Sequence, residues 1–173
     1  MTDPDVARSA GLGVCLVDRA IVVAAPPERV YALLTQADEI VRWMAPDAHV
    51  EAVVDGVISW RHANGDRVEG RFVELVPARR VAFTYGWDRE DVGIPTRSTL
   101  VEITLTPLPS ADGTRTELHL VHRGLSEPMA RAHHGGWTNY LTRLAAVAEG
   151  RDPGTDPLAA GRVPAAAGHG VES

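Results

Sequence analysis

The sequence predicts a single α+β domain in which a curved antiparallel sheet of about six to seven strands wraps a long C-terminal helix. From residue 49 to residue 122, short stretches alternate apolar and polar residues, and turn dipeptides such as Asp55-Gly56 and Asn64-Gly65 separate them. Helical patterns flank these stretches only at the two ends. Strands joined by hairpins, with helices grouped at the ends, are typical of α+β proteins.

The N-terminal part of the chain predicts one strand and then two short helices. Residues 14–24 are rich in β-branched side chains and are expected to form the first strand. A short helix is expected from Pro27 onward, because proline and the acidic Glu28 are both favourable in a first helical turn. Apolar residues at helical spacing predict a second short helix over residues 37–43, which Pro46 ends.

The middle of the chain predicts the remaining strands of the sheet. We expect type I′ turns, with positive φ at both central residues, at the Asp-Gly and Asn-Gly pairs. Asp112-Gly113 marks a further turn, and the charged segment 88–97 is expected to be a surface loop in which Gly93 would permit a lid-like movement. The expected strands cover residues 49–54, 57–62, 67–76, 81–87, 98–107 and 114–122.

The last predicted element is the long helix, which we expect to open at Ser126 and to end at Gly150. Serine is a favoured N-cap residue, and Glu127 and Pro128 suit the first turn. Apolar residues then recur every three or four positions and form one buried stripe. The members of the stripe are Trp137, Tyr140, Leu141, Leu144 and Val147.

The ends of the chain are expected to lie outside the folded domain. Residues 1–12 are small and polar and predict a flexible N-terminal arm, and residues 13–150 make up the domain. Residues 151–173 are rich in proline, glycine and alanine, with little apolar surface to bury, and predict a disordered tail.

The composition argues against several classes of function. The chain has 173 residues and a formal net charge of -6, which is unfavourable for neutralising phosphates, so no nucleic-acid partner is expected. Cys15 is the single cysteine, so neither an internal disulfide nor a cysteine-based zinc site is expected. We find no signal-peptide pattern and no apolar run of membrane-spanning length, and we expect a cytoplasmic protein.

Three segments resemble a known family. They are IVVAAPPERVYALLTQADEIVRWM (21–44), GRFVELVPARRVAFTYGW (70–87) and LVHRGLSEPMARAHHGGWTNYLTRL (120–144). They are similar to the Hsp90-ATPase-activator-homologue branch of the START/Bet v 1-like (SRPBCC) superfamily, and the resemblance extends over residues 16–149. It implies the helix-grip fold, usually with a gap between sheet and helix. Members of the superfamily bind lipids, transport hydrophobic metabolites, cyclise polyketides, assist chaperones or confer drug tolerance, so the fold alone does not fix the function.

We expect a ligand cavity between the sheet and the C-terminal helix, lined by apolar and aromatic side chains. Tryptophan is large and amphipathic, and it suits a cavity wall as well as a core anchor. The orientation of Glu69, Arg71 and Glu74 stays open. The candidate ligand-binding residues are Trp43, Tyr85, Trp87, Ile103, Leu120, His122, Trp137, Tyr140 and Leu141.

Histidine chemistry is the other candidate feature. His122 is expected on the inward face of its strand, where it would donate a hydrogen bond, act as a base, or hold a neighbouring group in place. His133 and His134 are adjacent, so they cannot form the i, i+4 pair that binds zinc on a helix. We expect no metal and no cofactor, and the sequence contains no Gly-x-Ser-x-Gly nucleophile motif.

Three functional hypotheses follow. The first is non-catalytic binding of a small hydrophobic or aromatic molecule, including sequestration of, or resistance to, a natural product. The second is a cyclase or aromatase that shapes a polyketide, for which a cavity histidine or carboxylate with a shifted pKa would be the sign. The third is a protein-interaction module such as a chaperone regulator, which would show a large exposed apolar patch.

Overall fold

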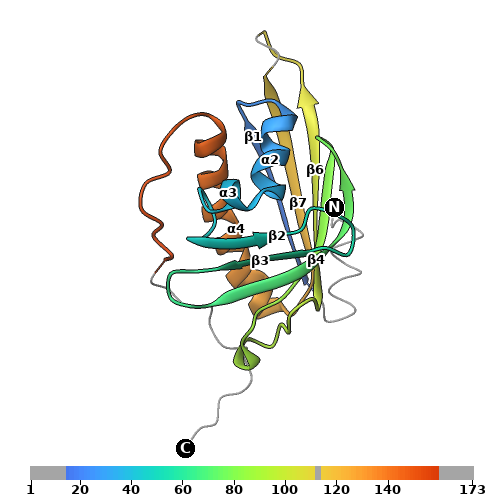
Figure 1. Ribbon diagram of the computed structural model, residues 1–173, viewed down its shortest axis with the longest axis vertical. Helices are drawn as coiled ribbons and strands as arrows, with labels where there is room; N and C mark the ends of the chain where they lie inside the picture. The colour runs from blue at the N-terminus through green and yellow to red at the C-terminus, as the bar shows by residue number, and fades with distance from the viewer. Residues whose placement is uncertain (1–14, 112–113, 160–173) are drawn as a thin grey trace, which may run out of the picture.

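The computed structural model describes residues 15–111 and 114–159, so the expected N-terminal arm (1–12) and the Asp112-Gly113 turn lie outside the described residues. A seven-stranded antiparallel sheet dominates the structure, with the strand order β1-β7-β6-β5-β4-β3-β2 (Figure 1). This confirms the predicted fold class. The strands are β1 (Cys15–Val23), β2 (Asp47–Val50), β3 (Val57–Arg61), β4 (Arg67–Val76), β5 (Arg80–Tyr85), β6 (Thr99–Leu108) and β7 (Arg115–Leu125).

Three α-helices and a short 3-10 helix complete the described fold: α2 (Pro27–Thr35), α3 (Ala37–Ile40), η1 (Glu90–Val92) and α4 (Glu127–Ala148). The helix α4 follows the prediction at both ends. Ser126 occupies the N-cap position, although its side chain makes no capping hydrogen bond. Gly150 has a left-handed φ of 78°, the conformation that commonly ends a helix.

The hairpin turns differ from the expected two-residue type. Only Asp55 (φ 68°) has a positive φ in the first turn, and only Gly65 (φ 93°) in the second. Both loops are longer than two residues. The backbone N–H of His62 bonds to the carbonyl of Asp66, which leaves a three-residue loop, and the side chain of Asn64 accepts the N–H of Asp66. A longer loop needs a left-handed residue at only one position, so the type I′ prediction is wrong.

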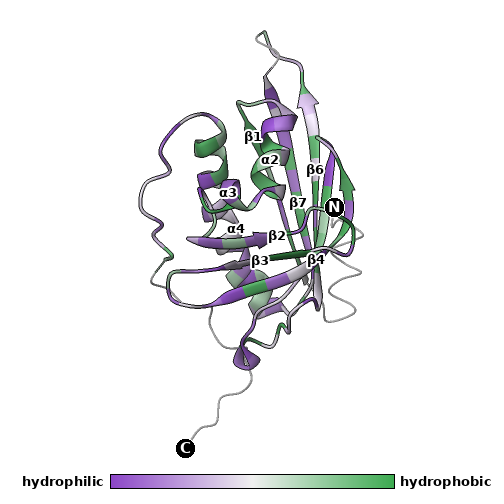
Figure 2. Cartoon of the chain, viewed as in Figure 1, coloured by the Kyte–Doolittle hydropathy of each residue, from purple (hydrophilic) through white to green (hydrophobic). Residues whose placement is uncertain are grey.

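The core lies between the concave face of the sheet and the helices α2 and α4. Neighbouring strands present paired apolar residues to this face, such as Ile103 of β6 opposite Leu120 of β7, and both are fully buried. Helix α2 buries Val30, Leu33 and Leu34, and the hydropathy colouring shows both purple and green parts on this helix (Figure 2). The amphipathic patterns therefore bury the faces that periodicity predicted.

The segment after α4 differs from the prediction of a tail disordered from residue 151. Residues 151–159 run back alongside α4 (Figure 1). The guanidinium of Arg143 donates to the backbone carbonyls of Pro153 (3.2 Å) and Gly154 (2.9 Å). Asp156 accepts hydrogen bonds from the Asn139 amide (3.1 Å) and the Tyr140 hydroxyl (2.8 Å). Residues 160–173 of the expected tail lie outside the described residues.

Candidate functional site

A pocket of about 510 Å³ opens where the N-terminal half of α4, the β3–β4 hairpin, the end of β5 and the segment after α4 meet. Most of its wall is apolar or aromatic. The lining residues are Met44, Trp60, His62, Asn64, Asp66, Tyr85, Trp87, Ala132, His133, Gly135, Gly136, Trp137, Asn139, Tyr140, Pro157 and Leu158.

Four of the nine residues expected to line a cavity lie in the wall of this pocket: Tyr85, Trp87, Trp137 and Tyr140. The other five do not line it. The structure places Trp43, Ile103, Leu120, His122 and Leu141 in the closed part of the core.

Hydrogen bonds explain why Trp43 and His122 do not line the pocket. The indole N–H of Trp43 donates to the backbone carbonyl of Leu33 (2.8 Å), which turns the ring toward α2. His122 is fully buried and lies behind Trp137, at 3.1 Å from its indole nitrogen. Ile103, Leu120 and Leu141 are at most 1% exposed and belong to the continuous hydrophobic core.

Two buried histidines hold two of the three tryptophans of the wall, Trp87 and Trp137. Trp137 donates its indole N–H to Nδ1 of His122, so the proton of this imidazole is on Nε2, which donates to the Thr99 hydroxyl (2.8 Å). Trp87 donates to Nε2 of His133 (2.9 Å), and Nδ1 of His133 donates to the backbone carbonyl of Met129 (2.8 Å). Every ring nitrogen of the two histidines is therefore occupied, and each indole is fixed at its polar edge.

The environment keeps both imidazoles neutral. Burial lowers the pKa of His122 well below 6.5, and the nearby His133 lowers it further. Burial also lowers the pKa of His133, which the hydrogen bond to Met129 opposes. His122 thus has no free lone pair with which to accept a substrate proton, and its role in this geometry is to position Trp137.

His62 is a pocket residue that the sequence analysis missed. Its ring stacks on Trp87, with centroids 5.7 Å apart, and its Nδ1 lies 3.4 Å from the hydroxyl of Tyr140. Burial lowers the pKa of His62, while the carboxylates of Asp156 and Asp66 act in the opposite direction. Alternation beyond the end of β3 places His62 on the same side as Trp60, and this is the signal that would have indicated it.

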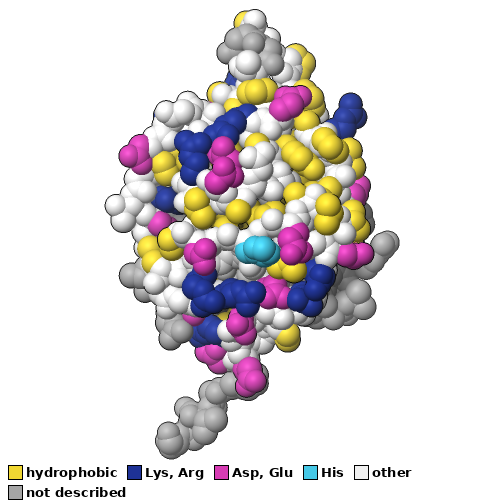
Figure 3. All heavy atoms as spheres, viewed as in Figure 1, with side chains coloured by type: hydrophobic (Ala, Val, Ile, Leu, Met, Phe, Trp, Pro, Cys, Tyr) yellow, Lys and Arg dark blue, Asp and Glu magenta, His cyan; other side chains and the backbone are white. Residues whose placement is uncertain are grey.

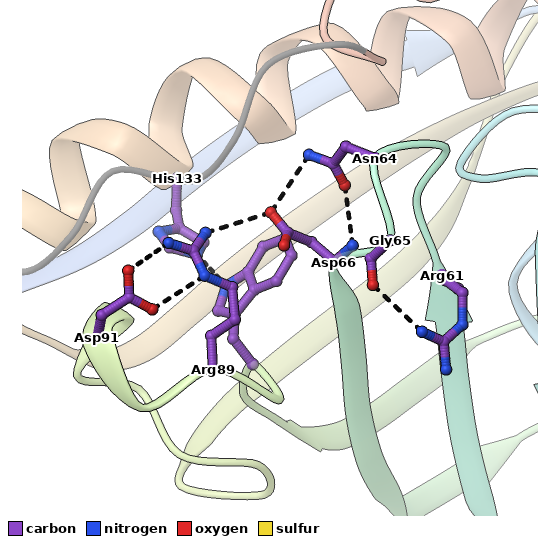
Figure 4. A network of polar contacts seen from close by, with 8 residues as sticks. Arg61, Asn64, Gly65, Asp66, Arg89, Asp91 and His133 are labelled. Carbon is purple, nitrogen blue, oxygen red and sulfur yellow. Dashed lines mark hydrogen bonds and ion pairs between the residues drawn. The ribbon is translucent and has the colours of Figure 1, made fainter.

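A polar network joins the β3–β4 hairpin to the 88–97 loop at the rim of the pocket (Figure 4). The carboxylate of Asp66, whose side chain is only 3% exposed, accepts hydrogen bonds from Asn64 (3.2 Å) and Arg89 (3.2 Å). Arg89 also pairs with Asp91. Together with the buried Val92, these contacts tie the 88–97 loop to the hairpin. In this structure the loop that the sequence suggested as a lid is anchored.

Two glycines of α4 leave space in the wall. A Cβ atom built on Gly135 or Gly136 would meet no atom within 4 Å outside the neighbouring backbone. Both glycines line the pocket one turn before Tyr140. Small residues on this turn of α4 therefore contribute to the hollow.

The two pocket tyrosines remain protonated. Burial raises the pKa of the Tyr85 hydroxyl far above its usual value. Burial and the hydrogen bond to Asp156 likewise raise the pKa of Tyr140. Both phenols are neutral groups at physiological pH.

The charges of β4 whose orientation was open lie outside the pocket. Glu69 pairs with Arg67 and Arg97, the guanidinium of Arg71 donates to the Asp55 carbonyl (2.6 Å), and Glu74 pairs with Arg80. The space-filling view shows basic and acidic side chains interspersed on the lower part of one face (Figure 3).

Within residues 15–111 and 114–159, no group of three or more histidine, cysteine or acidic side chains is placed to hold a metal ion. No helix of the described chain is long and apolar enough to cross a membrane.

Comparison with known proteins assigns the family. The model of the Activator of Hsp90 ATPase homolog 1-like protein family matches residues 24–149. The chain belongs to this family. It is thus an AHSA1-like member of the START/Bet v 1-like superfamily, as the three sequence segments suggested. No relative was found among the curated proteins.

Solved structures of AHSA1-like and related proteins share the fold. The AHSA1-like protein from Rhizobium etli is 39% identical, with a TM-score of 0.61 over 90% of this chain and 95% of that one. A protein from Chromobacterium violaceum is 28% identical, with a TM-score of 0.65 over 78% and 96%. DynU16, a protein in the dynemicin biosynthetic locus, is 19% identical, with a TM-score of 0.67 over 82% of this chain and 50% of that one.

Proposed function

We propose that this AHSA1-like protein binds a small, largely apolar aromatic molecule in the pocket between the sheet and α4. The observation that carries the proposal is a hollow of about 510 Å³ whose wall includes three tryptophans and two tyrosines. This volume lies within the range of about 300–1,000 Å³ typical of small-molecule sites. The wall combines apolar surface with a few polar groups, which is the usual composition of such sites.

Two tryptophans of the pocket wall already have fixed orientations without a ligand. The indoles of Trp87 and Trp137 are held by buried histidines and do not have to be ordered on binding. A preorganised wall reduces the entropy that binding costs. Burial of apolar ligand surface at roughly 25 cal/mol per Å² then supports micromolar affinity for a molecule of this size.

The tryptophans provide a direct test. Trp60, Trp87 and Trp137 line the pocket, and Trp43 does not. In a fluorescence titration with hydrophobic natural products, polyketide intermediates and fatty acids, a true pocket ligand should quench the wild-type protein. It should quench the Trp43→Phe variant to the same extent, because the pocket fluorophores remain.

A pocket-filling variant separates binding from surface adsorption. Gly136→Leu places a side chain in the open wall without removing any hydrogen bond of the wall, and we expect it to weaken binding at least tenfold, which is about 1.4 kcal/mol. Arg131→Leu adds a similar apolar group on the exposed side of α4 and should leave the affinity unchanged. Equal affinity of a folded Gly136→Leu variant and the wild type would remove the pocket from consideration.

Within the binding function, we propose sequestration of a natural product as the biological role. The fold shared with DynU16, a protein of a biosynthetic locus, supports this role at the level of fold only. A cyclase has less support in the geometry, because the nitrogens of His122 are already engaged. Product analysis after incubation with a bound polyketide separates the two: unchanged ligand supports the binder.

A second candidate function is regulation of a chaperone, and the family description favours it because it names an activator of the Hsp90 ATPase. Such a role would depend on the surface of the protein and not on the pocket. The test is the ATPase rate of a cognate Hsp90 in the presence of the wild type and of Gly136→Leu. Stimulation by both proteins would support the interaction module.

A further inference from the structure

We propose that the molecule bound in this pocket is an aromatic hydrogen-bond donor without negative charge, and that Nε2 of His62 accepts its hydrogen bond. The inference rests on the proposed binding function and specifies the chemistry of the ligand. It follows from the direction of the hydrogen bonds around Tyr140 and from the charges that the pocket wall contains and lacks.

The hydrogen bonds around Tyr140 assign the proton of His62. The Tyr140 hydroxyl has one proton, and at 2.8 Å from the carboxylate of Asp156 it donates that proton there. The phenol oxygen can then only accept from His62, whose Nδ1 lies 3.4 Å away. Neutral His62 therefore carries its proton on Nδ1 and presents a lone pair at Nε2.

Nε2 of His62 is a polar atom of the wall that a ligand can satisfy, whereas the unpaired indole N–H of Trp60, another lining residue, is itself buried away from solvent. No residue in the described part of the chain bonds to Nε2 of His62, whereas both ring nitrogens of His133 are engaged. The ring of His62 is stacked on Trp87, which fixes its orientation. A ligand O–H or N–H would pair with the lone pair, and a ligand that presents only acceptors would leave it unpaired.

The charges around the pocket disfavour an anionic ligand. The lining contains the carboxylate of Asp66 and no arginine, and Asp156 lies directly behind Tyr140. The chain has 17 basic residues, but Arg89 and Arg143, whose charges act on residues of the pocket, are already engaged. Arg89 pairs with Asp66 and Asp91, and Arg143 donates to backbone carbonyls. A buried ligand carboxylate would lack a positive partner, which is costly.

The experiment compares three probes that share one aromatic body: naphthol, its methyl ether and naphthoate. Affinities are measured by calorimetry at neutral pH on the wild type, on His62→Phe, and on His119→Phe as a matched change at an exposed histidine. We expect the wild type and His119→Phe to prefer naphthol over the methyl ether by about two- to tenfold, the effect of one hydrogen bond. Naphthoate should bind most weakly. In His62→Phe the preference for naphthol should disappear while the methyl ether still binds.

Other outcomes overturn the inference in distinguishable ways. If the methyl ether binds the wild type as tightly as naphthol, or naphthoate binds tightest, the donor inference is wrong and the proposed binding function stands. If naphthol and its ether both fail to bind, while the tryptophan titration also shows no ligand, the binding function itself is wrong. The comparison of probes on the wild type decides the matter even where His62→Phe does not fold.

Discussion

Two parts of α4 are packed in different ways. In the C-terminal part, from Leu141 onward, the residues Leu141, Leu144 and Val147 are almost fully buried in the hydrophobic core, and none of them lines the pocket. Before that point, Trp137 and Tyr140 are buried to a similar degree but border the pocket. One continuous apolar stripe thus forms a closed core at one end and a hollow at the other.

The difference between the two parts comes from what holds the side chains. Aliphatic residues are held only by contact with their neighbours, so they pack until no gap is left. At the other end, the indole of Trp137 on α4 and that of Trp87 after β5 are held by hydrogen bonds to buried histidines, and the adjacent glycines add no side-chain volume. Aromatic rings held by hydrogen bonds can border an empty space without collapsing into it. We infer that the closed part of α4 serves stability, whereas the part that borders the pocket serves binding.

The largest change in stability is expected from Leu144→Ala, which tests whether the closed part of α4 serves stability and not binding. Leu144 is fully buried in the closed part, and its truncation should lower the free energy of unfolding by about 2–5 kcal/mol. Urea unfolding measures the loss, and ligand affinity at a temperature where the variant is folded should be unchanged. A large drop in affinity of the folded variant would show that the two parts are coupled.

The next effect is the pH dependence of the free energy of unfolding, which tests the part of the structure that contains the buried His122 and His133. The unfolded chain protonates His122 and His133 near their ordinary pKa of 6.5, whereas the folded protein resists protonation because burial lowers both pKa values. The stabilisation is therefore complete above about pH 6.5 and is lost as the pH falls, by on the order of 1 kcal/mol per pH unit for each such histidine. Burial lowers the pKa of His62 too, and it adds to the loss in the same direction.

Urea unfolding between about pH 7.5 and pH 5 measures this loss in a window above the titration of most carboxylates. Glu39, Glu69 and Glu102 have pKa values lowered from 4.5, so their contribution appears only at lower pH. A stability that stays flat or rises as the pH falls through this window would contradict the neutral, hydrogen-bonded state of the two histidines.

The smallest expected effect is a gain from Gly135→Ala. Glycine within a helix costs roughly 0.5–1 kcal/mol relative to alanine, and a Cβ at this position meets no neighbouring atom. Thermal unfolding should show a stabilisation of about that size, together with a small loss of pocket volume. A destabilised variant would mean that the helix backbone at this turn is under a constraint that its open surroundings do not show.

The candidate site could be predicted only in part from the sequence. Strict alternation in residues 81–87 and the helical stripe identified Tyr85, Trp87, Trp137 and Tyr140 as inward-facing, and all four border the pocket. The same patterns selected Ile103, Leu120 and Leu141, which the closed core buries. Periodicity tells which face of an element is buried, but it cannot tell whether the opposing face touches it or leaves a gap.

The sequence by itself determined the family, the order of the elements and the apolar faces of the sheet and of α4, because these depend on local spacing and turn residues. Only the tertiary structure decided where along α4 the hollow lies, that His122 and His133 hold tryptophans, and that His62 and the segment around Asp156 meet at Tyr140. These contacts join residues far apart in the chain, such as His62 and Tyr140. Their pairing depends on how the folded elements are placed against one another, which no local pattern contains.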